Sequence, residues 1–228
     1  MEGIGLMPLD DEIRDFIARA NLNIASQRIR DRGILYAEGL KGKVHQAEMA
    51  LNRLASLCTT VDVALPEDEQ QYSVMELVQF YCEAYSAFLY SSLDILAQII
   101  NQVRRCGMDE HEVSIKRIRN WLNQNAGGTP LQTTVDGLAK SRVFTSLDRY
   151  RNCCLHRRHI YIRGEQRRVD HAPGYSATGP VATITWLIAD NPLDLQPSVL
   201  QNRQIPDYLQ RSFNTLQPQL EAVLQMLP

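Results

Sequence analysis

The sequence lacks the long apolar stretches of an integral membrane protein. No run of about 18 or more apolar residues occurs, and a helix that crosses a bilayer needs about 20. The first residues, Met1-Glu2-Gly3-Ile4-Gly5, lack the basic region and the apolar segment of a secretory signal. We therefore expect no signal peptide, no transmembrane helix and no membrane partner.

Regularly spaced pairs of cysteines are also missing. The chain has five cysteines, an odd number, and two of them are adjacent. They are Cys58, Cys82, Cys106, Cys153 and Cys154. Reduced thiols in a cytoplasm are the simplest explanation. Two histidines, His156 and His159, follow the adjacent pair, but no second ligand pair has the spacing of a zinc site, so we expect no metal.

A large excess of charge is absent as well, but the charge is unevenly distributed. The formal net charge is −2, whereas residues 149–171 carry seven arginines and two acidic residues, a local charge of +5 that leaves −7 elsewhere. The seven are Arg149, Arg151, Arg157, Arg158, Arg163, Arg167 and Arg168. Such a local positive field indicates either an anion-binding surface or a solvated basic hairpin.

Most of the chain has the three-to-four-residue apolar spacing of amphipathic helices. The spacing predicts helices over 9–31, 35–58, 73–105, 109–124 and 131–156, with Gly33 as a stop after the first. A last helix is expected from Asp207, kinked or split at Pro218. The acidic, proline-marked segment 66–69 reads as a linker. It divides an N-terminal helical extension, 1–65, from a main domain, 66–228, unless the two form one continuous domain.

The apolar period changes from 3.6 to 2 after residue 158. Residues 159–163 alternate polar and apolar side chains, and residues 181–188 are rich in β-branched and aromatic residues. We therefore expect a β-hairpin over about 158–190 with a long basic loop, and a proline-punctuated loop after it. The predicted fold class is mainly α, a helical bundle with one hairpin.

The side chains best suited to binding phosphate and transferring protons lie in one segment at the end of the predicted 131–156 helix. This segment is Arg151-Asn152-Cys153-Cys154-Leu155-His156. The Arg151 guanidinium has the forked donor geometry that fits phosphate oxygens. The His156 imidazole can take or give a proton near neutral pH. The structural alternative is that both residues only offset the dipole and bond the carbonyls of a helix end.

This arrangement resembles the HEPN superfamily, helical domains named for higher eukaryotes and prokaryotes. The resemblance rests on the Arg-polar-x3-His motif near the end of a late helix, on the Tyr, Ser and acidic residues of a long upstream helix from Tyr85 to Asp94, and on the hairpin after the motif. It covers about residues 70–190. One departure concerns the Tyr that some toxin members carry two residues after the motif His. Position 158 is Arg here, and Tyr161 lies three residues further along than that Tyr would. Regulation through a modified Tyr at that position is therefore not expected.

The resemblance implies a helical bundle, usually a homodimer, and often a metal-independent ribonuclease of a toxin–antitoxin or defence system. Carried onto this sequence, it makes Arg151, Asn152 and His156 catalytic, with no cofactor. Candidate supporting residues are Asp94, His159 and Tyr161. Candidate RNA-binding residues are Arg157, Arg158, Arg163, Arg167 and Arg168.

Three functions remain open at this point. The first is an endoribonuclease with Arg151 as phosphate clamp and His156 as general acid or base. The second is a non-catalytic HEPN module that binds RNA, a nucleotide or a protein partner such as an antitoxin. The third is a helical scaffold that dimerises through its terminal helices.

The motif spacing makes a further demand. Positions five apart on a straight helix differ by about 140° around the axis, so Arg151 and His156 would not share one face. Either the helix is distorted there, or a second copy of the chain completes the site across a two-fold axis.

Overall fold

The computed structural model describes residues 8–58, 69–156, 159–169, 181–189, 191–193 and 199–228. Seven α-helices, one short 3-10 helix and one three-stranded sheet occur in this part of the chain. The mainly α fold class with a hairpin after the motif helix is therefore confirmed. None of the described helices is both long enough and apolar enough to cross a membrane.

Two compact units make up the chain, and each is assembled from separated segments. Unit 1 consists of residues 1–46, 88–148 and 212–228, and unit 2 of residues 47–87 and 149–211. The predicted boundary near residue 65 falls within 59–68, outside the described residues. The predicted linker at 66–69 lies outside them too, except for Glu69, which begins α3.

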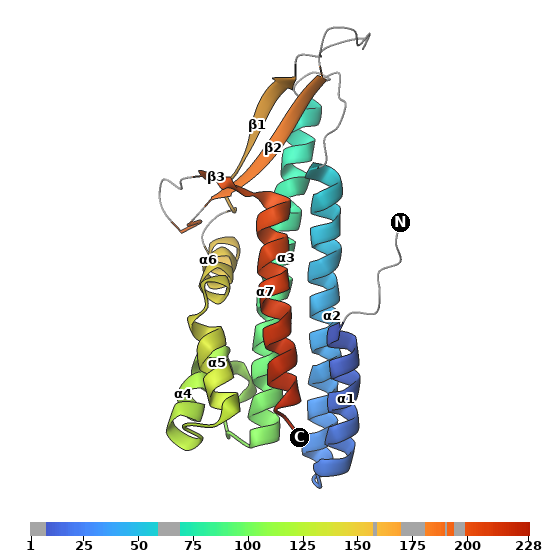
Figure 1. Ribbon diagram of the computed structural model, residues 1–228, viewed down its shortest axis with the longest axis vertical. Helices are drawn as coiled ribbons and strands as arrows, with labels where there is room; N and C mark the ends of the chain where they lie inside the picture. Colours follow the sequence, from blue (N-terminus) through green and yellow to red (C-terminus); the bar gives the residue numbers. More distant parts are fainter. Residues whose placement is uncertain (1–7, 59–68, 157–158, 170–180, 190, 194–198) are drawn as a thin grey trace. The chain divides into compact units, whose positions relative to one another are not determined.

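Unit 1 begins with α1 (Pro8–Asn23) and the first part of α2 (Gln27–Cys58), which lie alongside each other (Figure 1). The second part of α3 (Glu69–Arg104) and the end of α7 (Ile205–Gln225) also belong to it. Its core contains apolar side chains at helical spacing from these helices. Examples are Leu9, Ile13, Phe16, Leu40, Leu96, Ile99, Ile100 and Leu220.

The prediction of Gly33 as a helix stop was wrong. Helix α1 ends at Asn23, and α2 starts at Gln27 and runs through Gly33. Gly33 is buried, and a Cβ there would stand 3.7 Å from Val103 and 3.9 Å from Phe16. These are ordinary contact distances, so a Cβ would fit here, and the packing of α2 as a whole outweighs the low helix propensity of glycine.

Capping residues explain two further corrections in unit 1. The predicted 109–124 helix is a 3-10 helix (Glu110–Glu112) followed by α4 (Ile115–Asn125), because the Ser114 hydroxyl caps α4 at the backbone N–H of Arg117. The predicted 131–156 helix is divided into α5 (Pro130–Lys140) and α6 (Arg142–His156). There Ser141 is extended, and its hydroxyl accepts from Phe144 N at 3.1 Å, as an N-cap does.

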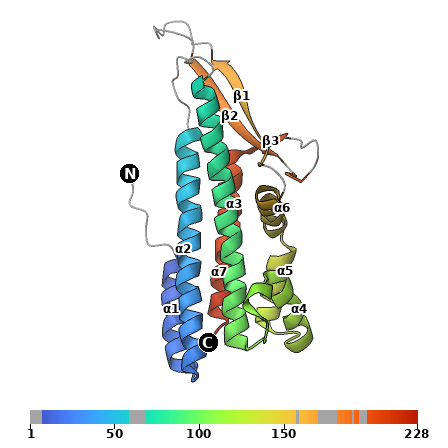
Figure 2. The same cartoon turned by 180° about the vertical axis from the view of Figure 1, so that it is seen from behind.

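Unit 2 carries the sheet, which lies beside the first turns of α3 in both views (Figures 1 and 2). Strands β1 (Ile162–Val169) and β2 (Val181–Ala189) pair antiparallel, from Ile162 opposite Ile188 to Val169 opposite Val181. Gly164 faces Trp186 across the ladder, and a Cβ at Gly164 would come within 3.2 Å of that ring. A side chain at this position would press against Trp186 and Ile184, which would have to shift slightly to admit it.

A third strand was not expected. β3 (Val199–Gln204) pairs antiparallel with β2 where the sequence predicted a loop, and the pairing shifts register between Leu187 and Ala189. Helix α7 follows at once, begins two residues before the predicted Asp207, and is not split at Pro218. Pro218 is exposed, whereas Leu216 and Leu220 beside it are buried, so packing holds the helix together around the proline.

Candidate functional site

The motif lies on the last turns of α6, in unit 2, and two buried side chains fix these turns. The Tyr150 hydroxyl donates to the carbonyl of Ala189 at 2.7 Å, at the end of β2. The Cys153 thiol donates to the carbonyl of Pro192 at 3.3 Å. One face of α6 is thereby anchored to the chain around the end of β2.

The motif residues lie on the flank of this anchored face. Arg151 and Asn152 are half-buried, whereas Leu155 is 55% exposed. Arg151 is therefore partly accessible to solvent. This is a suitable placement for a side chain that must bind an anion arriving from solution.

His156 is the last residue of α6, and the helix has no interruption between Arg151 and His156. The His156 side chain and residues 157 and 158 lie outside the described residues, so the roles of His156, Arg157 and Arg158 stay predictions. The backbone shows that α6 continues as a helix through both motif positions. The distorted helix that would bring positions 151 and 156 onto one face is not observed.

Glu83, on α3, anchors the chain just after the motif. Its Oε1 accepts the backbone N–H of Ile160 and lies within hydrogen-bond distance of His159 Nδ1, both at 3.0 Å. Gln79 Nε2, one turn earlier on α3, donates to the same oxygen at 3.3 Å. Glu83 therefore fixes where the chain leaves α6. The sequence interpretation missed it, although an acid at the centre of an apolar helix stripe could have indicated it.

Three thiols around the motif have raised pKa values. Burial raises the pKa of Cys154 and of Cys58 to about 12, and it raises the pKa of Cys82 well above its usual value. The Tyr150 pKa is also raised, by burial first and then by Tyr208. The formal charges of the described site include those of Arg151 and Glu83.

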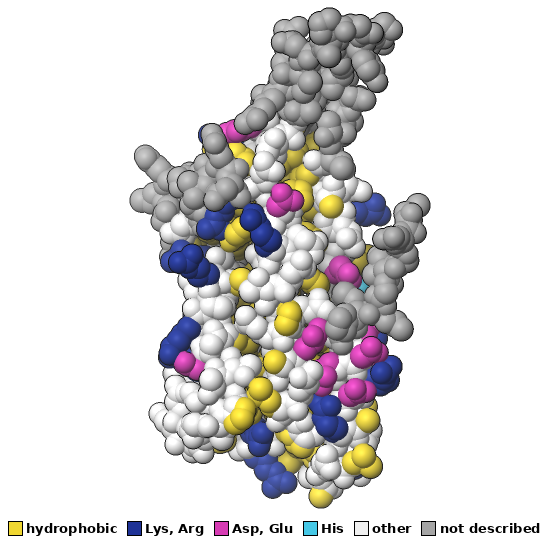
Figure 3. All heavy atoms as spheres, viewed as in Figure 1, with side chains coloured by type: hydrophobic (Ala, Val, Ile, Leu, Met, Phe, Trp, Pro, Cys, Tyr) yellow, Lys and Arg dark blue, Asp and Glu magenta, His cyan; other side chains and the backbone are white. Residues whose placement is uncertain are grey.

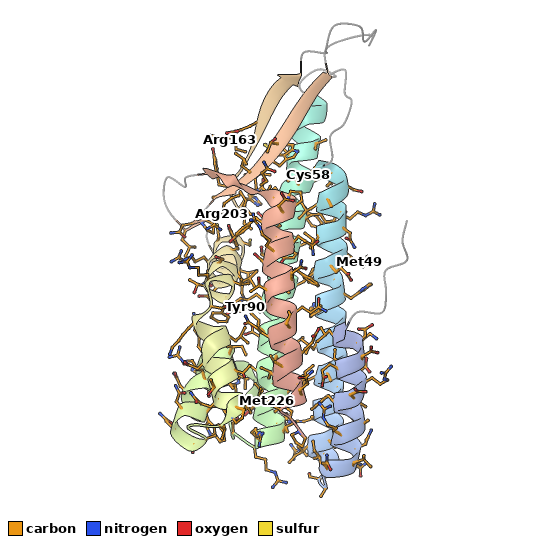
Figure 4. The ribbon with its side chains drawn as sticks, in the orientation of Figure 1. Met49, Cys58, Tyr90, Arg163, Arg203 and Met226 are labelled. Atoms are coloured by element: carbon orange, nitrogen blue, oxygen red, sulfur yellow. The ribbon has the colours of Figure 1, made fainter. Side chains whose placement is uncertain are left out.

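Arg203 adds a basic side chain that the sequence interpretation did not include. It extends from β3, and its guanidinium lies over the Tyr208 ring, 4.4 Å from the ring centre (Figure 4). Its charge lowers the Tyr150 pKa against the larger effect of burial, so Arg203 acts electrostatically on the anchoring hydroxyl of Tyr150. Only the three-dimensional structure relates position 203 to position 150.

The remaining predicted residues are distributed along β1 and α3. Tyr161 is exposed, and its carbonyl accepts Ala189 N at 3.0 Å. Arg163, labelled in Figure 4, lies on β1 and forms an ion pair with Glu165, two residues further along the strand. Arg167 and Arg168 belong to β1, with side chains outside the described residues. Asp94 is half-buried in the part of α3 that belongs to unit 1, so its orienting role stays a prediction.

Two observations bear on charge and metals. The described part of the face in Figure 3 carries both basic and acidic side chains. Among the described residues, no three His, Cys, Asp or Glu side chains converge as a set of metal ligands.

The family follows from a comparison with known domains. Residues 36–180 match the family model described as Cthe2314-like HEPN, a span that contains most of α2, all of α3 to α6 and β1. The chain belongs to this HEPN family. No curated protein and no solved structure matches the chain significantly. The HEPN match includes Arg151 and His156 and ends just before β2, so β3 and α7 lie beyond it.

Proposed function

We propose that this HEPN protein is a metal-independent endoribonuclease in which Arg151 binds the scissile phosphate and His156 transfers protons. The observation that carries the proposal is the position of Arg151-Asn152-x3-His156 on a helix end, within the HEPN match, with Arg151 on a solvent-accessible flank. A role in toxin–antitoxin or defence systems is part of the same hypothesis.

RNA supplies its own nucleophile, so the protein has few tasks. A base removes the proton of the 2′-hydroxyl, and the oxygen attacks the adjacent phosphorus. The bond to the 5′-oxygen breaks, and an acid returns a proton to that leaving group. The products are a 2′,3′-cyclic phosphate and a 5′-hydroxyl, and no metal is needed for the proton balance.

Each motif side chain has one role in this scheme. The Arg151 guanidinium stabilises the negative charge that accumulates on the phosphorane oxygens. The His156 imidazole is the base or the acid. The Asn152 amide donates to a phosphate oxygen or holds the tautomer of His156. His159 and Tyr161 follow the motif, held in place by the Glu83 anchor and by the Ala189 hydrogen bond.

The regular helix requires a second copy of the chain in this proposal. Within one chain, positions 151 and 156 of the uninterrupted helix α6 are about 140° apart around the helix axis. Two chains related by a two-fold axis would bring two copies of the motif to one phosphate, with one histidine for each proton transfer. The same geometry supports the alternative function, a HEPN module that binds RNA, a nucleotide or a protein without cleaving, if the copies do not pair in this way.

Incubation of the purified protein with single-stranded RNA in EDTA tests the proposal. We expect cleavage by the wild type and losses on the order of 10²–10³-fold for Arg151→Ala and 10²–10⁴-fold for His156→Ala. Arg149→Ala, at an exposed position two residues earlier on α6, should cleave like the wild type. RNA binding without cleavage by the wild type would reject the nuclease and favour the binding module.

A further inference from the structure

A pocket of about 360 Å³ lies in unit 1, formed where the start of α2 meets the end of α3. Three of its lining residues are arginines, Arg28 and Arg32 from α2 and Arg105 from the turn after α3. Ser26 and Gln102 add neutral hydrogen-bonding groups, and none of the described residues lining the pocket is acidic. The lining therefore carries a formal charge of +3.

These guanidiniums are not engaged in holding the fold. Within the described part of the chain, no hydrogen bond or ion pair holds the side chain of Arg28, Arg32 or Arg105, and all three are exposed. Their neighbours behave differently. Arg30 pairs with Asp31, and Arg104 donates to the carbonyl of Met226 at 3.1 Å. Arginines without partners around one concavity form an arrangement that fits phosphate oxygens.

The backbone of α2 supports the same charge preference. Arg30 N donates to the Ser26 carbonyl at 3.0 Å, so Ser26 stands at the start of this 32-residue helix. The first turn of α2 contains no acidic side chain to offset the positive end of the helix dipole. Arg28 and Arg32 are one turn apart and lie on the same side of the helix.

Arg105 provides an independent observation. Its φ is +53°, and it is the single non-glycine residue with positive φ among the described residues. Arg105 N donates to the Gln102 carbonyl and Cys106 N to the Asn101 carbonyl, the two bonds of a Schellman motif at a helix end. Glycine is the residue favoured at this position, because a side chain is strained there. A long basic side chain is present instead, and it lines the pocket.

The turn after α3 that carries Arg105 is held by hydrogen bonds from Asn101. Asn101 is buried, and its side-chain amide both donates to the carbonyl of Met108, at 3.0 Å, and accepts Met108 N, at 3.3 Å. These two bonds hold the turn 105–108, which carries Arg105. The pocket is therefore preorganised on the α3 side, which lowers the entropic cost of binding.

From this arrangement we infer that the pocket of Arg28, Arg32 and Arg105 binds a small compound with two or three linked phosphate groups. Three cations match an oligophosphate better than a single phosphate, and the volume is that of a small-molecule pocket. The inference does not depend on the proposed cleavage, since it concerns residues of unit 1 only.

Calorimetric titration with inorganic triphosphate and with ATP tests the inference. Saturable binding is expected, weakened by added salt, and weakened roughly tenfold or more in the Arg28→Gln/Arg32→Gln double variant. The matched control is Arg30→Gln, on the same turn of α2, which should bind like the wild type. Equal affinities for the two ligands would indicate recognition of the phosphates alone, and tighter binding of ATP would identify a nucleotide.

Arg105→Gly separates binding from folding. Glycine relieves the strained backbone, so thermal stability should be unchanged or higher, while triphosphate affinity should fall several-fold. No saturable binding by the wild type, or equal binding by the double variant, would overturn the inference. So would a 5′-hydroxyl RNA that displaces triphosphate from the wild type, because the ligand would then be a nucleic-acid backbone.

Discussion

Single residues of unit 2 make this protein sensitive to alkaline pH. Burial raises the pKa of Cys58 and Cys154 to about 12, and unfolded thiols ionise near pH 8.5. Between these values the unfolded chain has released protons that the folded chain retains, so the free energy of unfolding decreases as pH rises. The urea midpoint should therefore fall between about pH 9 and pH 11.

A double variant separates the contribution of these thiols to the loss of stability from that of other groups that titrate at alkaline pH. The fall in urea midpoint should be shallower in the Cys58→Ala/Cys154→Ala double variant, because two of the thiols with a raised pKa are gone. Identical slopes in the wild type and the double variant would contradict the assignment.

Glu83 is the residue whose removal should loosen the chain after the motif. Glu83→Ala leaves Ile160 N without its acceptor, and we expect a loss of about 1–3 kcal/mol in the free energy of unfolding. Glu83→Gln should lose less, because the amide oxygen can still accept from Ile160 N. Urea denaturation measures both. Glu76→Gln, at an exposed position on the same helix, is the control and should match the wild type.

At the scale of residues, the sequence was sufficient to predict site residues that lie on one helix. It was insufficient to predict those that come together from distant parts of the chain. Arg151 and His156 are five residues apart, so their pattern is visible along the chain. Glu83 and Ile160 are 77 residues apart, and Arg203 acts electrostatically on Tyr150 from a strand that the sequence did not predict. Contacts between such distant positions leave no spacing in the sequence to detect.

At the scale of elements, helices were predicted well and their ends less well. The apolar period of α3 was sufficient to predict a long helix, and the change of period after residue 158 predicted the hairpin. The break at Ser141 was missed because a capping serine interrupts a helix without changing the apolar spacing around it. β3 was missed because this strand depends on the exposed edge of β2 for its pairing.

The attachment of α6 to the sheet gives a prediction at this scale. Tyr150→Phe removes the buried hydroxyl that donates to the Ala189 carbonyl, and the free energy of unfolding should fall by about 1–2 kcal/mol. Tyr161→Phe alters a tyrosine that is 43% exposed and should change it by less than about 0.5 kcal/mol. Urea denaturation compares the two. Equal effects would mean that the Tyr150 hydroxyl does not hold α6 to β2.

For the whole molecule, the proposed site requires two chains. Specific cleavage activity should therefore fall as the protein is diluted below the dimer dissociation constant, in step with the dimer fraction measured by sedimentation. A specific activity that stays constant while the protein becomes monomeric would contradict the paired-motif site.

The most direct measurement of the central claim uses a DNA strand that contains one ribonucleotide, incubated with the protein in EDTA. The account predicts one cut, after the ribonucleotide, that leaves a 2′,3′-cyclic phosphate and is lost in His156→Ala and Arg151→Ala. Cutting of the all-DNA strand, a requirement for a divalent metal, or full activity of either variant would contradict it.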